Sequence, residues 1–374
     1  MGILRAMLSG AVLSGSLIDG QAQTPVSSPP AVVPAVDGIF VAFQSHSIVG
    51  VADWHGLAQE EDFYVDLIRD PRFADEIGNV VVEFGDAAQQ DTIDRYLAGE
   101  DIPYEQLRRV WTDTVGWLPT VTALGYLNFF AQVRAVNEGL PLSERIHIWL
   151  GEPPIDWSKV KTSADLTQTS QRDRYPAELI KSQILAKHRK SLVIYGSVHF
   201  FGSERLKPLV EQSYPGAFFV VTPYRGFQNK MDSDVFEQDM EGWRSRVPAT
   251  QAKGAKALLL EEQGAGAVGD ALLYLGPAAS LTESPITPDL YLDLAFRKEI
   301  NRRSLIVNEH LSRLLSRSCH LHSIVGKDCI PFKSFVNWVT STVSLYFPSE
   351  PRRCRMPRRR ALAIVDGSNR RWRK

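Results

Sequence analysis

Two short runs of β-branched residues, separated by one helical segment, constrain the fold more than any other feature of this chain. The first run covers residues 48–51 and the second covers residues 80–82. Between them, residues 58–69 place apolar side chains on one side and acidic or amide side chains on the other, which predicts an amphipathic helix. Glu60 and Glu61 are interpreted as facing solvent or the helix N-terminus. A strand, a helix and a second strand are typical of a crossover between parallel strands, so the two strands are predicted to be neighbours.

The same alternation of strands and helices continues through the body of the chain. Further strands are predicted at residues 146–150, 192–195, 217–221 and 271–275, and helices at 91–97, 103–111, 121–136, 177–188, 206–212 and 288–317. Residues 165–174 and 228–246 are mostly polar without a clear period, and we interpret them as connections. The predicted fold class is α/β, with a mostly parallel central sheet flanked by helices.

The two ends of the chain differ from this body. Residues 1–22 contain one basic residue, an apolar run and a small-residue cleavage motif, an order typical of a secretory signal peptide. Residues 23–37 are rich in proline and predict an extended linker. The folded domain is predicted over residues 38–317, followed by a basic, poorly ordered tail over residues 318–374. A signal peptide implies an extracytoplasmic protein, either periplasmic or secreted.

Charge is distributed unevenly along the chain. The formal net charge of the 374 residues is -1, but residues 351–374 contain ten Arg or Lys and one acidic residue. The rest of the chain therefore carries a net charge of -10, which argues against nucleic acid as a partner of the body. No stretch after the N-terminal run has the apolar length of a transmembrane helix. A small molecule is the expected ligand or substrate.

Polar side chains follow the predicted strands where each strand ends. His55 follows the first strand, Glu83 ends the second, Glu152 follows the third, His199 follows the fourth and Arg225 follows the fifth. Parallel strands end at one edge of their sheet, and open α/β sheets bind ligands at that edge. The sequence therefore predicts that these side chains line one site.

Three kinds of chemistry are open to two imidazoles and a carboxylate at such an edge. A histidine held by a carboxylate can act as a general base on water. His55, Glu83 and His199 can instead be the ligands of a catalytic divalent metal ion. A single exposed histidine can bind haem iron. In the hydrolytic versions, the residues expected to bind the substrate are Asp53, Trp54, Glu152, Asp156 and Arg225.

These motifs resemble the superfamily of erythromycin esterases, ChaN-type haem-binding proteins and Tiki-type metalloproteases. The resemblance rests on His55-Gly56, the Val-Val-Glu-Phe-Gly motif at 81–85 and the Gly-Ser-Val-His motif at 196–199, and it covers residues 39–315. It implies that His55 and Glu83 are the catalytic pair of an esterase-like hydrolase and that His199 belongs to the same site.

The superfamily leaves three functions open for this chain. The first is a hydrolase acting on an ester or related acyl bond, with or without a metal ion. The second is an extracytoplasmic haem carrier with His55 or His199 as the axial ligand. The third is a member that keeps the fold without the activity, because esterase-like members commonly have Gly-Glu where this chain has Val51-Ala52. The nearest acid here is Asp53.

Overall fold

A single eight-stranded sheet forms the centre of the computed structural model, which describes residues 31–115, 122–246, 257–260 and 269–322. The strand order is β1-β7-β8-β6-β2-β5-β3-β4. From β8 to β4 each strand runs parallel to its neighbour, whereas β7 pairs antiparallel with both β8 and β1. The mostly parallel α/β sheet predicted from the sequence is thereby confirmed. The strands are β1 Ala31–Pro34, β2 Ile48–Asp53, β3 Asn79–Asp86, β4 His147–Glu152, β5 Ser191–Gly196, β6 Phe218–Pro223, β7 Ala257–Leu260 and β8 Ala271–Tyr274.

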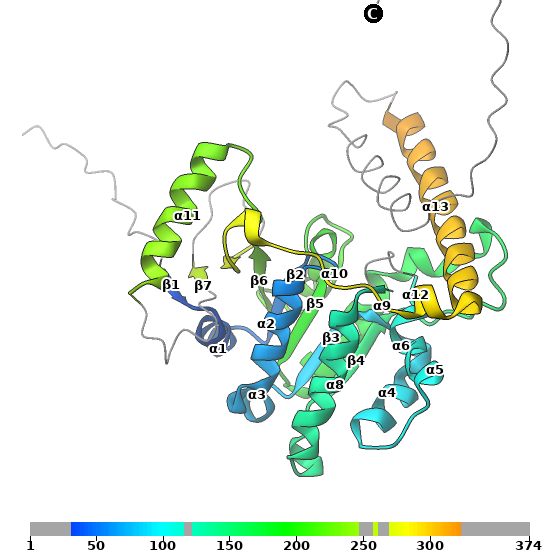
Figure 1. Ribbon diagram of the computed structural model, residues 1–374, viewed down its shortest axis with the longest axis horizontal. Coiled ribbons are helices and arrows are strands. Elements are labelled where there is room, and N and C mark those ends of the chain that lie inside the picture. The colour runs from blue at the N-terminus through cyan, green and yellow to red at the C-terminus, as the bar shows by residue number, and fades with distance from the viewer. Residues whose placement is uncertain (1–30, 116–121, 247–256, 261–268, 323–374) are drawn as a thin grey trace, which may run out of the picture.

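Helices cover both faces of this sheet (Figure 1). Val80 and Val82 of β3 pack in a large apolar cluster with side chains of α1, α2 and α8, whereas Val81 packs in a second cluster with side chains of α9 and α10. Successive strand residues point to opposite faces, so a strand covered on both faces is apolar throughout. The helices are α1 Ala35–Ser45, α2 Ala58–Arg69, α3 Pro71–Glu76, α4 Gln90–Leu97, α5 Tyr104–Leu107, α6 Arg109–Thr112, α8 Leu124–Glu138, α9 Arg174–Leu179, α10 Leu206–Glu211, α11 Lys230–Arg244, α12 Asp289–Leu292 and α13 Leu294–His322.

The prediction that the first two strands are neighbours was wrong. β5 lies between β2 and β3 and pairs with both, in parallel. Strand adjacency is decided by which apolar faces pack together, and a strand made later in the chain fits between the first two. The end of β5 consequently lies between the ends of the strands that carry His55 and Glu83.

Several predicted boundaries also differ from the structure. The linker predicted over 23–37 already contains β1 and the start of α1, and the polar segment 228–246 contains α11. The helix predicted over 288–317 is interrupted at Asp293 and continues to His322. The predicted signal peptide, and the predicted tail beyond residue 322, lie outside the described residues. No helix in the described ranges is long and apolar enough to cross a membrane.

Candidate functional site

The imidazole of His55 is held by a carboxylate at the end of β2. His55 Nδ1 lies 2.7 Å from Asp53 Oδ2. Asp53 is buried and accepts two further hydrogen bonds, from the hydroxyl of Tyr64 at 2.6 Å and from the hydroxyl of Tyr126 at 2.7 Å. A carboxylate that accepts three hydrogen bonds cannot turn, so Asp53 fixes the plane of the His55 ring.

Glu83 of β3 lies at the centre of the site. Its Oε2 accepts a hydrogen bond from the backbone N–H of Gly196 at 2.6 Å and lies 3.6 Å from His55 Nε2. Its Oε1 forms an ion pair with Arg172 and lies 3.4 Å from His199 Nε2. Glu83 therefore contacts groups from the ends of two other strands, β2 and β5, and from the segment before α9.

Gly196 allows this close approach between strand ends. A Cβ atom at position 196 would lie 3.0 Å from His55 Nε2 and 3.2 Å from Glu83 Oε2. Both distances are tighter than ordinary van der Waals contact, so any larger residue would push the imidazole or the carboxylate away.

The second histidine has a carboxylate partner of its own. His199 Nδ1 lies 2.7 Å from Asp173 Oδ1, and Asp173 also pairs with Arg205 at 3.1 Å. Arg172 extends the network in the other direction, because its Nε donates to Glu152 Oε1 at 2.8 Å. Two histidines, two arginines and four carboxylates are thus joined in one chain of contacts along the carboxyl edge of the sheet.

The positive groups around Glu83 keep it ionised. Burial raises the pKa of Glu83, but the charges of His55, His199 and Arg172 together hold that pKa well below its ordinary value. Burial raises the pKa of Glu152 above its ordinary value, although Arg172 opposes this shift. Glu83 is therefore ionised at neutral pH.

The two imidazoles respond to the same carboxylate to different degrees. Burial lowers the pKa of His55, but Glu83 and the hydrogen bond to Asp53 raise it above its ordinary value of 6.5. Burial also lowers the pKa of His199, whereas Glu83 and the bond to Asp173 raise it to about 9. His199 is therefore a cation at neutral pH. His55 titrates above 6.5, and its side chain is 20% exposed against 4% for His199.

The three residues predicted as metal ligands do come together, yet a guanidinium competes with any metal ion there. Arg172 already neutralises Glu83 and Glu152. Within the described ranges, no group of three or more His, Cys, Asp or Glu residues is arranged to hold a metal ion. The geometry thus gives the metal-dependent version no support.

The predicted substrate-binding residues are divided between the site and its surroundings. Asp53 and Glu152 belong to the network, but both are buried and bind other protein groups. Trp54 is 37% exposed beside His55, and the guanidinium of Arg225 stacks on its ring with Cζ 2.9 Å from the centroid. Asp156 lies apart from these contacts, because its carboxylate is exposed and bonds to Ser158 and Lys159.

Several residues of the network were missed in the sequence. Arg172 and Asp173 lie in the polar segment interpreted as a connection, and Tyr64 and Tyr126 lie on the helices that cover the sheet. The alternation of apolar and polar residues does not mark the arginine and the aspartate. The available signal was a pair of adjacent opposite charges. The predicted site contained acids without a predicted cationic partner, and such a pair could have supplied one.

The positions predicted for two acidic residues at the start of α2 were wrong. Glu60 and Glu61 were predicted to face solvent or the helix N-terminus, but their relative exposures are 0% and 4%. Glu60 Oε2 accepts the backbone N–H of Trp54 at 2.9 Å, so this carboxylate helps to shape the loop that carries His55. Burial raises the pKa of Glu61 to about 8.

Comparisons with known proteins give structural similarity at low levels. No protein-family model and no curated protein matches the chain. One similar solved structure is ChaN of Campylobacter jejuni, described as binding haem cofacially, with 12% identity and a TM-score of 0.34 over 54% of this chain and 93% of that chain. Another is the type III effector HopBA1, with 12% identity and a TM-score of 0.36 over 55% and 90%. A Bacillus cereus protein has 10% identity and a TM-score of 0.40 over 67% and 93%. These values assign the chain to no family.

Proposed function

We propose that this chain is a hydrolase that acts on an ester or related acyl bond of a small molecule, with His55 as the general base. The observation that carries the proposal is the pair formed by His55 and Asp53, with the carboxylate fixed by two tyrosine hydroxyls. The hydroxyls donate to Asp53, so its carboxylate is the acceptor and its histidine partner donates the proton on Nδ1. The Nε2 atom then has a free lone pair.

That lone pair is placed to accept a proton from water. In the proposed reaction, a water molecule at Nε2 gives its proton to His55 while its oxygen adds to the acyl carbonyl. The imidazolium that forms is stabilised by Asp53 at one nitrogen and by the ionised Glu83 near the other. The proton then passes from Nε2 to the leaving alkoxide as the acyl bond breaks. Arg225, on the exposed ring of Trp54, would hold the carbonyl oxygen or an anionic part of the substrate.

The haem-carrier alternative also depends on His55. Both nitrogens of His199 face carboxylates and its side chain is only 4% exposed, so His199 is poorly placed to reach a haem iron. His55 would have to turn its Nε2 away from Glu83 to bind iron. We place either function outside the cytoplasm because of the signal peptide predicted over residues 1–22.

The test is hydrolysis of a series of p-nitrophenyl esters by the purified protein, with and without a chelator. We expect chelator-insensitive hydrolysis that is lost in both His55→Gln and Glu83→Gln. The matched control is His46→Gln, because His46 is a partly exposed histidine at the end of α1, outside the network. Hydrolysis that survives both substitutions would refute the proposal. Absence of hydrolysis together with a Soret band on haemin addition, lost in His55→Gln, would establish the carrier function instead.

A further inference from the structure

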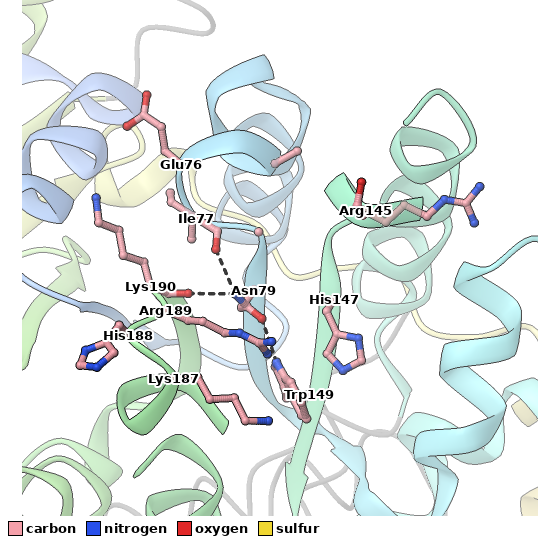
Figure 2. Close-up of a pocket in the computed structure, with 13 residues that line it drawn as sticks. Glu76, Ile77, Asn79, Arg145, His147, Trp149, Lys187, His188, Arg189 and Lys190 are labelled. Atoms are coloured by element: carbon pink, nitrogen blue, oxygen red, sulfur yellow. Dashed lines mark hydrogen bonds between the residues drawn. The ribbon is translucent and has the colours of Figure 1, made fainter. Parts of the chain in front are cut away.

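A cavity lies at the amino edge of the sheet, opposite the network around Glu83. Its volume is about 660 Å³, within the usual range for small-molecule sites. Its walls come from the start of β3, the start of β4 and the turn of residues 187–190 that leads into β5 (Figure 2). Neither the proposed hydrolysis nor any sequence motif accounts for this cavity.

The cavity is strongly basic. Lys187, Arg189, Lys190 and Arg145 line it, against a single carboxylate, Glu76. The guanidinium of Arg145 is already bonded to backbone carbonyls at the rim. Arg189 has no ion-pair partner within the described part of the chain, and Lys187 Nζ contacts only a neutral amide oxygen there. These two charges are therefore available to a ligand.

Figure 2 shows how these cations are directed. Arg189 and Lys187 point toward Trp149, whereas the side chains of Lys190 and His188 extend away from it. Trp149 is half-buried, and its ring lies 4.1 Å from the ring of His147 between centroids. Burial lowers the pKa of His147, which favours the neutral imidazole, although Asp94, 4.0 Å from its Nδ1, opposes this shift. A planar aromatic surface thus lies beside two uncompensated cations.

One buried side chain ties the three walls together. Asn79 Nδ2 donates to the carbonyls of Ile77 and Lys190, at 3.0 and 3.2 Å, while its Oδ1 accepts the indole N–H of Trp149 at 3.1 Å. The basic turn is also held in an uncommon conformation, because His188 has a left-handed backbone with φ 53°. The backbone of the three walls is therefore held in place by these contacts.

We propose that this cavity binds a small ligand in which an aromatic ring and a phosphate group are joined by a short linker. Arg189 and Lys187 would hold the phosphate, since a guanidinium offers paired donors to two phosphate oxygens and an ammonium adds a point charge. The indole of Trp149 would take the ring, and the edge of His147 would supply a hydrogen bond. A nucleoside monophosphate has this chemistry and fits the volume.

The test uses isothermal titration calorimetry of the full chain with AMP, inorganic phosphate and adenosine. We expect AMP to bind, and phosphate and adenosine to bind at least about tenfold more weakly, because each supplies half of the contacts. Arg189→Ala should weaken AMP binding by about tenfold or more. Lys161→Ala, which removes an exposed lysine outside the cavity, should leave binding unchanged.

A second variant separates the two halves of the proposed ligand. Trp149→Leu should weaken AMP binding while leaving the weak phosphate binding intact. Phosphate binding as tightly as AMP would overturn the aromatic part of the proposal. No AMP binding up to about 5 mM, or AMP binding that is unaffected by Arg189→Ala, would overturn it entirely. None of these outcomes depends on whether His55 catalyses hydrolysis.

Discussion

The two edges of the central sheet differ in whether their charged side chains are paired. At the carboxyl edge, Glu83 and His199 are buried, Arg172 is half-buried, and the three are paired with one another. At the amino edge, Arg189 and Lys187 are exposed and form no ion pair within the described residues. Paired buried charges hold groups in fixed positions, as catalysis requires, whereas unpaired exposed cations attract a charged ligand. The same strands, β3 and β4, contribute to both edges.

The largest effect is expected when one residue at each edge is mutated and both hydrolysis and AMP binding are measured. His55→Gln should lower kcat/KM for ester hydrolysis by about 10²- to 10⁴-fold, the usual contribution of a general base, without changing the Kd for AMP. Arg189→Ala should raise the Kd for AMP without changing kcat/KM for ester hydrolysis. Steady-state kinetics and calorimetry on both variants check this prediction. A parallel loss of both properties in either variant would show that the edges are not independent.

Removing the guanidinium of Arg172 should lower the free energy of unfolding, by nearly as much as His55→Gln raises the activation free energy. Arg172→Ala leaves Glu83 and Glu152 buried without their guanidinium partner. We expect the free energy of unfolding to fall by about 3–5 kcal/mol, as for other broken buried ion pairs. Arg189→Ala, at the exposed edge, should change it by less than about 0.5 kcal/mol. Urea denaturation gives both values, and equal effects would contradict the contrast between buried and exposed charge.

The buried imidazole should make stability depend on pH. The pKa of His199 is raised from 6.5 to about 9 in the folded chain, so its contribution is fully present below about pH 6.5 and is lost as pH rises through 9. At roughly 1.4 kcal/mol per pKa unit, this contribution is about 3 kcal/mol. The free energy of unfolding of the wild type should therefore fall more between pH 6 and pH 10 than that of His199→Gln. Parallel curves for the two proteins would sink this expectation.

A smaller effect is expected from a single methyl group at the carboxyl edge. Gly196 has φ -53°, which alanine adopts readily, so Gly196→Ala tests the space beside His55 and not the backbone. We expect kcat to fall about tenfold because the imidazole is displaced by a few tenths of an ångström. Gly242→Ala in α11, where the added methyl group meets nothing within 4 Å, is the matched control and should leave kcat unchanged. An unchanged kcat in Gly196→Ala would mean that the position of His55 is not critical.

Much of the carboxyl edge could be predicted from the sequence because each strand is a short apolar run with a polar residue at its end. His55, Glu83, Glu152 and His199 follow from that pattern alone, and all four belong to the observed network. Asp156 does not, since two prolines and a turn carry it away from the strand end. The chemistry proposed for these residues stays a prediction.

Contacts between distant segments could not be predicted in this way. The partners of Arg172 and Asp173 are fixed only when the segment before α9 folds over the strand ends.

The burial of Glu60 and Glu61 could have been anticipated, because they precede Phe63, Tyr64 and Leu67 at helical spacing and so continue the buried face of α2. The helix α11 was missed because of its polar composition, although Phe236, Met240 and Trp243 recur at helical spacing and pack together.

The position of β5 between β2 and β3 also governs when the site can form during synthesis. β2 is made early, but both of its partners, β5 and β6, begin at residues 191 and 218. A nascent chain that ends before residue 191 would contain His55 and Glu83 without the strand that brings them together. Pairing over such long sequence separations slows folding. The chain is therefore expected to acquire its site in one late step, after most of it has left the ribosome.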